Sequence, residues 1–293
     1  MQIESLKIFC DLTETQSFTK TAQIHGVTQS AISQQISMLE RLFKSLLIER
    51  SKKRFRLTDE GQVLYDCSKQ IIQIYETLHS QMQELKEIIS GTIRLATIYS
   101  IGLHDLPRYV KKFMRNFPTV NVHVELRHPR LVYADVLGNV ADMGLVAFPA
   151  KDSKLEIVPY GSDPLVFICH PQHPLAKQSK VRFKALAGQK FVAFESEIPT
   201  RRAIDKMFRS HGVSVNIAME FDNIETVKGA VEIDAGVSIV PQSTISREVA
   251  KRTLAAVPLE GGSFSRPLAI IYKKNRMLSP AMKELVAILK EGR

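Results

Sequence analysis

Short, uncharged hydrogen-bonding side chains gather on one face of a helix that the sequence predicts over residues 28–42. They are Gln29, Ser30, Ser33, Gln34 and Ser37. The opposite face is an apolar stripe at helical spacing, formed by Ile32, Ile36, Leu39 and Leu42. A face that serves only solubility usually carries Glu and Lys, whereas Gln and Ser suit base edges and phosphate oxygens in a major groove that admits a helix. This pattern indicates a helix that contacts double-stranded DNA.

The chain before this helix supplies the elements that must position it. The apolar spacing of residues 5–15 predicts a short amphipathic helix. A second helix is predicted to begin at Ser17 and to end at Gly26, which can adopt the left-handed conformation of a C-cap. Thr28 can then cap the helix of residues 28–42 through its hydroxyl. A helix, a glycine-containing turn and another helix form the helix-turn-helix pattern, in which the later helix is placed for recognition.

A basic segment follows, with five Lys or Arg among the seven residues 50–56. Two short strands with this segment at their tip would form a wing against the phosphates. Taken singly, the helix could be an ordinary bundle helix and the segment a solvated loop, because basic runs are common on protein surfaces. Their occurrence in this order within 60 residues favours a winged DNA-binding domain.

The first 60 residues resemble the winged helix-turn-helix of LysR-type transcriptional regulators. The resemblance is carried by residues 9–12 (FCDL), 17–22 (SFTKTA), 27–36 (VTQSAISQQI) and 57–61 (LTDEG). It implies a sequence-specific regulator in which two winged domains read the halves of an interrupted inverted repeat. The residues implied to face bases and nearby phosphates are Thr28, Gln29, Ser30, Ser33 and Gln34. Those implied to anchor the wing to the DNA backbone or minor groove are Arg50, Lys53 and Arg54.

A long helix is predicted from Thr58 to about residue 90, because apolar residues recur there in a heptad pattern. Residues that recur every seven positions form the first core position of the heptad: Leu64, Ile71, Leu78 and Leu85. The second core position, three residues later, is occupied by Cys67, Ile74, Gln81 and Ile88. We expect a two-chain coiled coil, since the winged domain is too small to cover such a helix. The alternative is a helix buried against its own domain. The coiled coil implies that the protein forms a dimer through residues 59–90.

From residue 92 onward strands and helices alternate, which predicts a mostly parallel sheet with helices on its faces. The pattern repeats after about residue 162, with strands expected over residues 164–169 and 268–272. Two such α/β units suggest a ligand cleft between two lobes. This region also resembles the LysR-type effector domain, which is itself similar to periplasmic binding proteins.

The expected fold class is therefore α+β and multidomain. A winged helix-turn-helix domain of residues 1–58 is followed by a coiled-coil linker helix of residues 59–90 and an effector-binding domain of residues 91–293. The resemblance further implies that lobe one combines residues 91–161 with 266–293, and that lobe two is residues 162–265. It also implies that effector domains pair, joining dimers into a homotetramer.

Candidate effector contacts lie where strands end or helices begin. The strand of residues 93–98 is expected to end at Ser100, where amides and a hydroxyl can face a crevice. Thr200 opens a helix whose free amides suit an anion. Related regulators commonly carry a Gly/Ser-rich turn there, whereas residues 197–199 are Glu, Ile and Pro, which argues against a simple anion site. The expected effector contacts are Ser100, Ile101, Val146, Thr200, Arg201 and Thr226, with plain capping or strand-end roles as the alternative.

Composition fits a soluble globular protein, with 44% hydrophobic and 24% charged residues and a net charge of +10. Cys10, Cys67 and Cys169 are far apart, which argues against a disulfide framework or a zinc site. No segment approaches 18 consecutive apolar residues, and the N-terminus has no signal-peptide pattern, so we expect a cytoplasmic protein.

The sequence offers no motif for catalysis or for a cofactor. The dinucleotide fingerprint, the P-loop, HExxH and GxSxG are all absent, so we predict neither an enzyme nor a bound cofactor. The imidazoles of His170 and His173 stand beside prolines without a third ligand, so no metal site is predicted. Two alternatives stay open, namely an architectural DNA-binding protein without an effector and an enzyme with a DNA-binding appendage.

Overall fold

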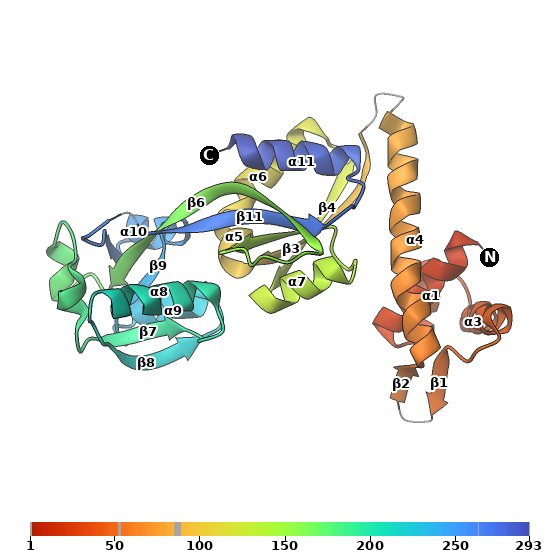
Figure 1. Cartoon of the computed structure of the whole chain (residues 1–293), viewed down its shortest axis with the longest axis horizontal. Coiled ribbons are helices and arrows are strands. Elements are labelled where there is room, and N and C mark those ends of the chain that lie inside the picture. Colours follow the sequence, from red (N-terminus) through yellow and green to blue (C-terminus); the bar gives the residue numbers. More distant parts are fainter. Residues whose placement is uncertain (1, 52–53, 85–88, 263, 293) are drawn as a thin grey trace. The chain divides into compact units, whose positions relative to one another are not determined.

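The computed structural model describes residues 2–51, 54–84, 89–262 and 264–292. The chain divides near residue 88 into an N-terminal unit and a larger C-terminal unit, and each is compact by itself (Figure 1). In the described parts of both units, no helix combines the length and the apolar character that crossing a membrane would require.

The N-terminal unit places a two-stranded antiparallel sheet between its third and fourth helices. Its described elements are α1 (Ile3–Thr15), α2 (Phe18–His25), α3 (Gln29–Phe43), β1 (Ile48–Ser51), β2 (Arg54–Leu57) and α4 (Asp59–Glu84). The predicted caps of α2 and α3 are confirmed. Gly26 ends α2 with φ +64°, and the Thr28 hydroxyl accepts a 3.2 Å hydrogen bond from the amide of Ala31.

The core of this unit forms between α1 and α3. Ile32, Ile36 and Leu39 are buried there, as the spacing predicts, together with Leu6 and Phe9 of α1. Leu42 was expected in the same stripe, but its side chain is 56% exposed, so that part of the prediction is wrong. Phe43 is also 44% exposed and the helix ends at Lys44, so the last turn of α3 lies beyond the part of the helix that the core covers.

Helix α4 packs on its own unit with one side and exposes another. Leu64, Tyr65 and Ile72 pack against the core of the N-terminal unit. A row of large apolar side chains on α4 nevertheless remains exposed: Val63, Ile71, Ile74, Tyr75, Leu78 and Met82. Of the predicted heptad, Leu85 and Ile88 lie outside the described residues. The winged unit therefore covers α4 only in part, as its size predicts.

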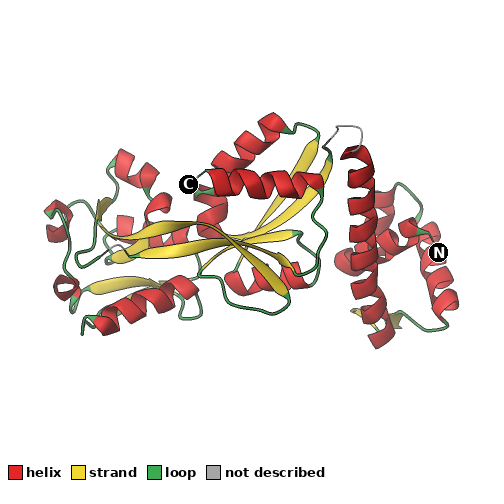
Figure 2. Ribbon diagram, turned by 45° about the horizontal axis from the view of Figure 1, so that its top comes forward, coloured by secondary structure: helices red, strands yellow, loops and turns green. Residues whose placement is uncertain are grey.

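The C-terminal unit has two hydrophobic cores. The first core, which we call lobe one, is built by β3 (Gly91–Ile98), α5 (Tyr99–His104), α6 (Leu106–Asn116), β4 (Val120–Arg127), α7 (Pro129–Leu137), β5 (Met143–Ala147) and α11 (Pro280–Glu291). The second, lobe two, is built by η1 (Pro174–Lys177), η2 (Phe183–Leu186), β7 (Lys190–Phe194), α8 (Pro199–Ser210), β8 (Asn216–Phe221), α9 (Ile224–Glu232), β9 (Ser238–Pro241) and β10 (Ala255–Val257). The short helices η3 (Gln242–Thr244) and α10 (Ser246–Lys251) lie between β9 and β10 in the chain. Helices cover the strands on both faces (Figure 2).

Two long strands, β6 (Leu155–Cys169) and β11 (Ser265–Lys273), connect the lobes. They pair with each other antiparallel, and the part of β6 beyond Pro164 then pairs with β9 and β10. The segments predicted as separate strands over residues 164–169 and 268–272 are thus parts of these longer strands. The sheet is also mixed rather than mostly parallel, because β6 and β11 run antiparallel to their neighbours whereas β3 runs parallel to β4 and β5.

Candidate functional site

The polar face of α3 is presented to solvent at the helix N-terminus. Thr28, Gln29, Ser30 and Gln34 are exposed, and Ser33 is half-buried. Thr28 caps the helix and also lies 2.9 Å from the Ser30 hydroxyl, so these two side chains support each other. The buried stripe on the other side fixes the rotation of α3, and this directs the five predicted contact residues outward together.

Contacts with α1 and α2 hold α3 in place. The Ser5 hydroxyl of α1 donates to the Gln35 side chain at 2.9 Å, which ties the two helices beside the core. Between α2 and α3 the amide of Val27 donates to the Ala22 carbonyl at 3.0 Å and closes the turn. The exposed end of α3 is therefore a preorganised surface, which limits the ordering that binding requires.

The wing is formed by β1 and β2, paired in register from Ile48 opposite Leu57 to Ser51 opposite Arg54. Arg50 and Arg54 belong to the two strands beside the tip, so the backbone brings them to the same end of the wing. Their side chains lie outside what the structure describes, and Lys53 lies outside the described residues altogether.

Residues 57–61, which helped to reveal the resemblance, join the wing to α4. The Thr58 hydroxyl donates to the Leu46 carbonyl at 2.6 Å and accepts from the Gly61 amide at 2.9 Å. Glycine is required at position 61, because a Cβ there would lie 2.1 Å from the Leu47 carbonyl oxygen. This motif therefore has a structural role, since it packs the start of α4 against the backbone of Leu46 and Leu47.

In the C-terminal unit, Ser100 lies in the first turn of α5 and not at the end of a strand, as the sequence reading had placed it. The side chains of Ser100 and Ile101 are both buried. The Ser100 hydroxyl oxygen accepts a 2.8 Å hydrogen bond from Nη1 of Arg266, a residue 166 positions later. That bond uses an acceptor site, and among the described residues the Ser100 hydroxyl proton has no acceptor, so it can be donated to a ligand.

Arg266 is the centre of a buried network that the sequence reading missed. Its side chain is 1% exposed, and Nη2 donates to Asp163 at 2.9 Å. Asp163 in turn accepts hydrogen bonds from the amide and hydroxyl of Ser243 at 3.2 and 2.7 Å. Burial lowers the pKa of Arg266, and Asp163 opposes that shift. The network links α5 of lobe one with η3 of lobe two through both connecting strands.

On lobe two, Thr200 and Arg201 begin α8. Thr200 is buried, whereas the guanidinium of Arg201 is held by partners within its own lobe. These are the Asp205 carboxylate at 2.9 and 3.0 Å, the Phe194 carbonyl at 2.6 Å and the Glu220 carboxylate. Burial alone would lower the pKa of Arg201, but the hydrogen bonds that Arg201 donates to the carboxylates of Glu220 and Asp205 outweigh this effect and raise the pKa. These contacts give Arg201 a bracing role in lobe two.

The last two predicted effector residues differ in accessibility. Val146 is buried in the middle of β5, opposite Ala269 of β11. Thr226 is exposed in the first turn of α9, and its hydroxyl donates to the Asn223 carbonyl at 3.0 Å. Of the two, only Thr226 presents its surface to solvent.

An ion pair and a hydrogen bond connect the lobes near these residues. Arg130 of α7 contacts Glu197 at 2.8 Å, three residues before Thr200. His104 of α5 contacts Glu225 at 2.7 Å, next to Thr226. The pKa of Glu225 is lowered, because hydrogen bonds from His104 and Lys228 outweigh the opposing effect of burial. The starts of α8 and α9 therefore both face lobe one.

Comparison with known proteins decides the family. Residues 3–62 match the family model of the bacterial regulatory helix-turn-helix protein, lysR family, and residues 86–293 match the LysR substrate binding domain. The chain belongs to the LysR family. It is a DNA-binding transcriptional regulator with a C-terminal effector-binding domain, as the resemblance implied.

Full-length relatives match this LysR-type regulator along nearly its whole length, and a relative's regulatory domain matches its C-terminal part. The HTH-type transcriptional activator CmpR of a Synechocystis species is 28% identical over 277 residues, which cover 94% of this chain and 91% of CmpR. Full-length CbnR in complex with its target DNA has a TM-score of 0.71 and 19% identity, covering all of both chains. The regulatory domain of Synechocystis CcmR in complex with 2-PG has a TM-score of 0.64 and 25% identity, covering 69% of this chain and 97% of that one.

Proposed function

We propose that α3 of this LysR-type regulator enters the major groove and reads bases through Gln29, Ser30, Ser33 and Gln34, with Thr28 near a phosphate. The observation that carries the proposal is the outward orientation of these uncharged side chains on a helix whose other face is locked in the core. Gln can contact adenine through two hydrogen bonds, and Ser can pair with donors or acceptors.

The wing is proposed to supply affinity rather than sequence preference. Arg50, Lys53 and Arg54 would contact phosphates or the minor groove, because the β1–β2 register brings both arginines to the tip. Contacts of this kind position a protein on DNA and make its affinity fall with salt.

We propose that the helix of residues 59–90 is the dimerisation element, between a DNA-binding domain of residues 1–58 and an effector-binding domain of residues 91–293. Its support is the exposed apolar row on α4, where Ile74 is 66% and Leu78 is 55% exposed. Burying such a row against a second copy removes apolar surface from water. The resulting dimer would place two copies of α3 on an interrupted inverted repeat, and effector-domain pairing would give a tetramer.

We propose that a small effector binds between the lobes beside Ser100, Thr200 and Thr226, with Ile101 and Val146 forming the packed floor and Arg201 bracing lobe two. The free proton of Ser100 and the amides that begin α8 are all donors, so the effector should present acceptor oxygens. The complexes of CcmR with 2-PG and of the QuiR effector domain with shikimate show that domains of this fold take small molecules. Effector binding would shift the arrangement of the lobes and thereby the bend of the DNA.

We assign this regulator no catalytic activity and no cofactor, since its relatives are regulators of transcription. The cytoplasm is the proposed location, because the operator DNA must be accessible there.

The experiment that tests the proposed function is fluorescence anisotropy of the full chain on its own upstream DNA and on a scrambled duplex of equal length, at fixed salt. A preference of at least a hundredfold, about 2.7 kcal/mol, is expected for a sequence-specific regulator. Equal affinity for both duplexes, and for neighbouring operator candidates, would instead support a protein that binds DNA by charge alone.

A further inference from the structure

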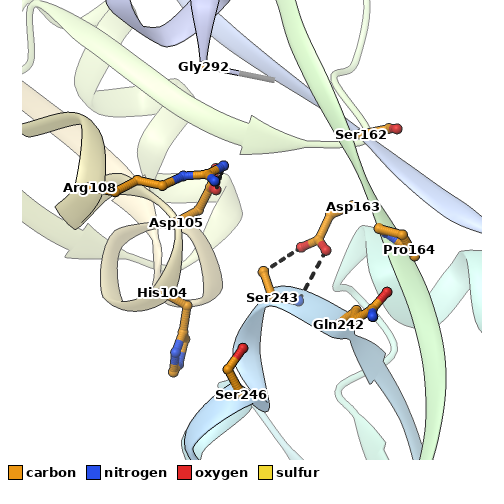
Figure 3. A pocket seen from close by; sticks show the side chains of 10 residues that line it. All are labelled: His104, Asp105, Arg108, Ser162, Asp163, Pro164, Gln242, Ser243, Ser246 and Gly292. Atoms are coloured by element: carbon orange, nitrogen blue, oxygen red, sulfur yellow. Dashed lines mark hydrogen bonds and ion pairs between the residues drawn. The ribbon is translucent and has the colours of Figure 1, made fainter. Parts of the chain in front are cut away.

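A cavity that does not include the proposed effector contacts opens where lobe one, lobe two and β6 meet. Its volume is about 540 Å³, within the range of about 300–1,000 Å³ that small-molecule sites occupy. Figure 3 shows its lining, in which His104 of α5, Arg108 of α6 and Asp105 between these helices face Ser243 and Ser246 of lobe two. Neither Ser100, Thr200 nor Thr226 lines it.

The charged groups of this cavity are matched one to one. Asp105 is buried and accepts from Nη2 of Arg108 at 2.8 Å and from the Tyr160 hydroxyl at 3.4 Å. Asp163 is buried and paired with Arg266 at 2.9 Å. Because each carboxylate already has its own cation, the wall carries little net charge although it is rich in polar atoms.

Hydrogen-bonding capacity remains available on the lobe-two side. Gln242 and Ser246 are exposed in the cavity lining, and within the described part of the chain no hydrogen bond of either side chain is found. Opposite them, the Arg108 side chain is 55% exposed, and the described bonds of its guanidinium to Asp105 and to the Tyr109 hydroxyl both use Nη2. The cavity therefore offers donors and acceptors from both lobes.

We propose that this cavity is a second ligand site, and that its ligand is a small, neutral, hydroxyl-rich molecule such as a sugar or polyol. A hydroxyl both donates and accepts, so it can satisfy the mixed lining. Because Asp105 is paired with Arg108 and Asp163 with Arg266, these carboxylates offer no uncompensated charge that would favour a charged ligand. An apolar ligand would leave polar groups buried without partners, which is costly.

A ligand in this cavity would regulate the arrangement of the lobes. It would bridge Arg108 of lobe one to Gln242 and Ser246 of lobe two, next to Asp163 of the connecting strand β6. A molecule that contacts both lobes binds best to one arrangement of them and shifts the population toward it. The site would thus act in concert with the effector cleft while remaining chemically distinct from it.

The test is saturation-transfer difference NMR with the full chain, using ribose, glucose and myo-inositol as neutral probes and citrate and succinate as anionic probes. The double variant Gln242→Ala/Ser246→Ala removes the exposed contacts of lobe two without touching the core. The matched control is Gln172→Ala/Ser153→Ala, which replaces the same residue types at exposed positions outside the cavity.

We expect at least one neutral probe to bind the wild type and the control, with at least tenfold weaker binding to the cavity variant. The proposal would be overturned if none of the three neutral probes shows saturation transfer. It would also be overturned if each probe gives equal saturation transfer with the cavity variant and with the control. If only citrate or succinate binds, and the cavity variant weakens that binding, the assignment of a neutral ligand would be overturned. None of these outcomes depends on the effector cleft, so the proposed function is tested separately by DNA binding.

Discussion

The buried pair of Arg266 and Asp163 gives the sharpest prediction about this regulator. We expect Arg266→Met and Asp163→Asn each to destabilise the C-terminal unit by about 3–5 kcal/mol, because each leaves a charge buried without its counterion. The distance of 2.9 Å and the exposure of 1% for Arg266 and 3% for Asp163 place the pair in the fully desolvated class. Asp163 would retain its bonds from Ser243, which keeps the loss within that range.

The double variant Arg266→Met/Asp163→Asn should cost far less than the sum of the single variants. With both charges gone, the remaining amide can still accept from Ser243, and replacing a buried ion pair by neutral groups is often nearly neutral. We therefore expect a coupling energy of at least about 2 kcal/mol in the double-mutant cycle.

The chain supplies a control with the same geometry but a different environment. Arg182 and Glu260 also lie 2.9 Å apart, with side chains 78% and 47% exposed. Arg182→Met and Glu260→Gln should each change stability by no more than about 1 kcal/mol. Burial, and not the distance between the charges, is then what separates the two pairs.

The assay is urea unfolding of the full chain, with hydrogen exchange of β6 peptides read at each concentration so that the C-terminal unit is scored by itself. Two results would refute the reasoning. One is a double variant whose cost equals the sum of its singles, and the other is an Arg182–Glu260 cycle of the same size as that of Arg266–Asp163.

Three further predictions concern DNA binding and pH. Gln29→Ala should weaken binding to the true operator by about 1–3 kcal/mol and leave binding to random DNA nearly unchanged, as measured by fluorescence anisotropy. An equal loss of affinity for both DNAs would mean that Gln29 only positions the helix. Arg54→Ala should weaken binding to all sequences alike and lower the salt slope by about one unit, and an unchanged slope would remove the wing from the proposed interface. The pKa of Glu225 is lowered from 4.5 in the folded state, so its contribution to stability is present above pH 4.5 and is lost as the pH falls further. Glu225→Gln should therefore reduce the loss of unfolding free energy that the wild type shows at acid pH. Equal acid dependence of the unfolding free energy in the wild type and the variant would contradict the shift.

The N-terminal unit was largely predictable because its signals are local. Thr28 and Gly26 mark helix boundaries through their own backbone and side-chain chemistry, and the apolar spacing of α3 identifies the face that the core must cover. The failure at Leu42 has the same origin, since periodicity alone does not say where the neighbouring helices stop. The heptad of α4 indicated an apolar row, and the structure shows which of its members stay exposed.

The C-terminal unit was predictable element by element but not in its connections. The strand expected over residues 164–169 is a small part of β6, because residues 155–163 are recruited by pairing with β11, roughly 100 positions away. The start of α5 at Tyr99 was missed since Ser100 follows a strong strand pattern without a turn signal. Sequence reasoning could recognise alternating α/β units, whereas the choice of partners for each strand depends on the whole sheet.

The sequence by itself determined which residues could do chemistry on DNA. Hydrogen-bonding type, helical spacing and caps are properties of short segments, so the polar face of α3 could be read directly from residues 28–42. The tertiary structure alone decided the sites of the C-terminal unit. It brought Arg266 to Ser100 and Asp163, and Arg108 opposite Ser246, because long-range strand pairing and burial, which local pattern does not encode, set the neighbours of each side chain.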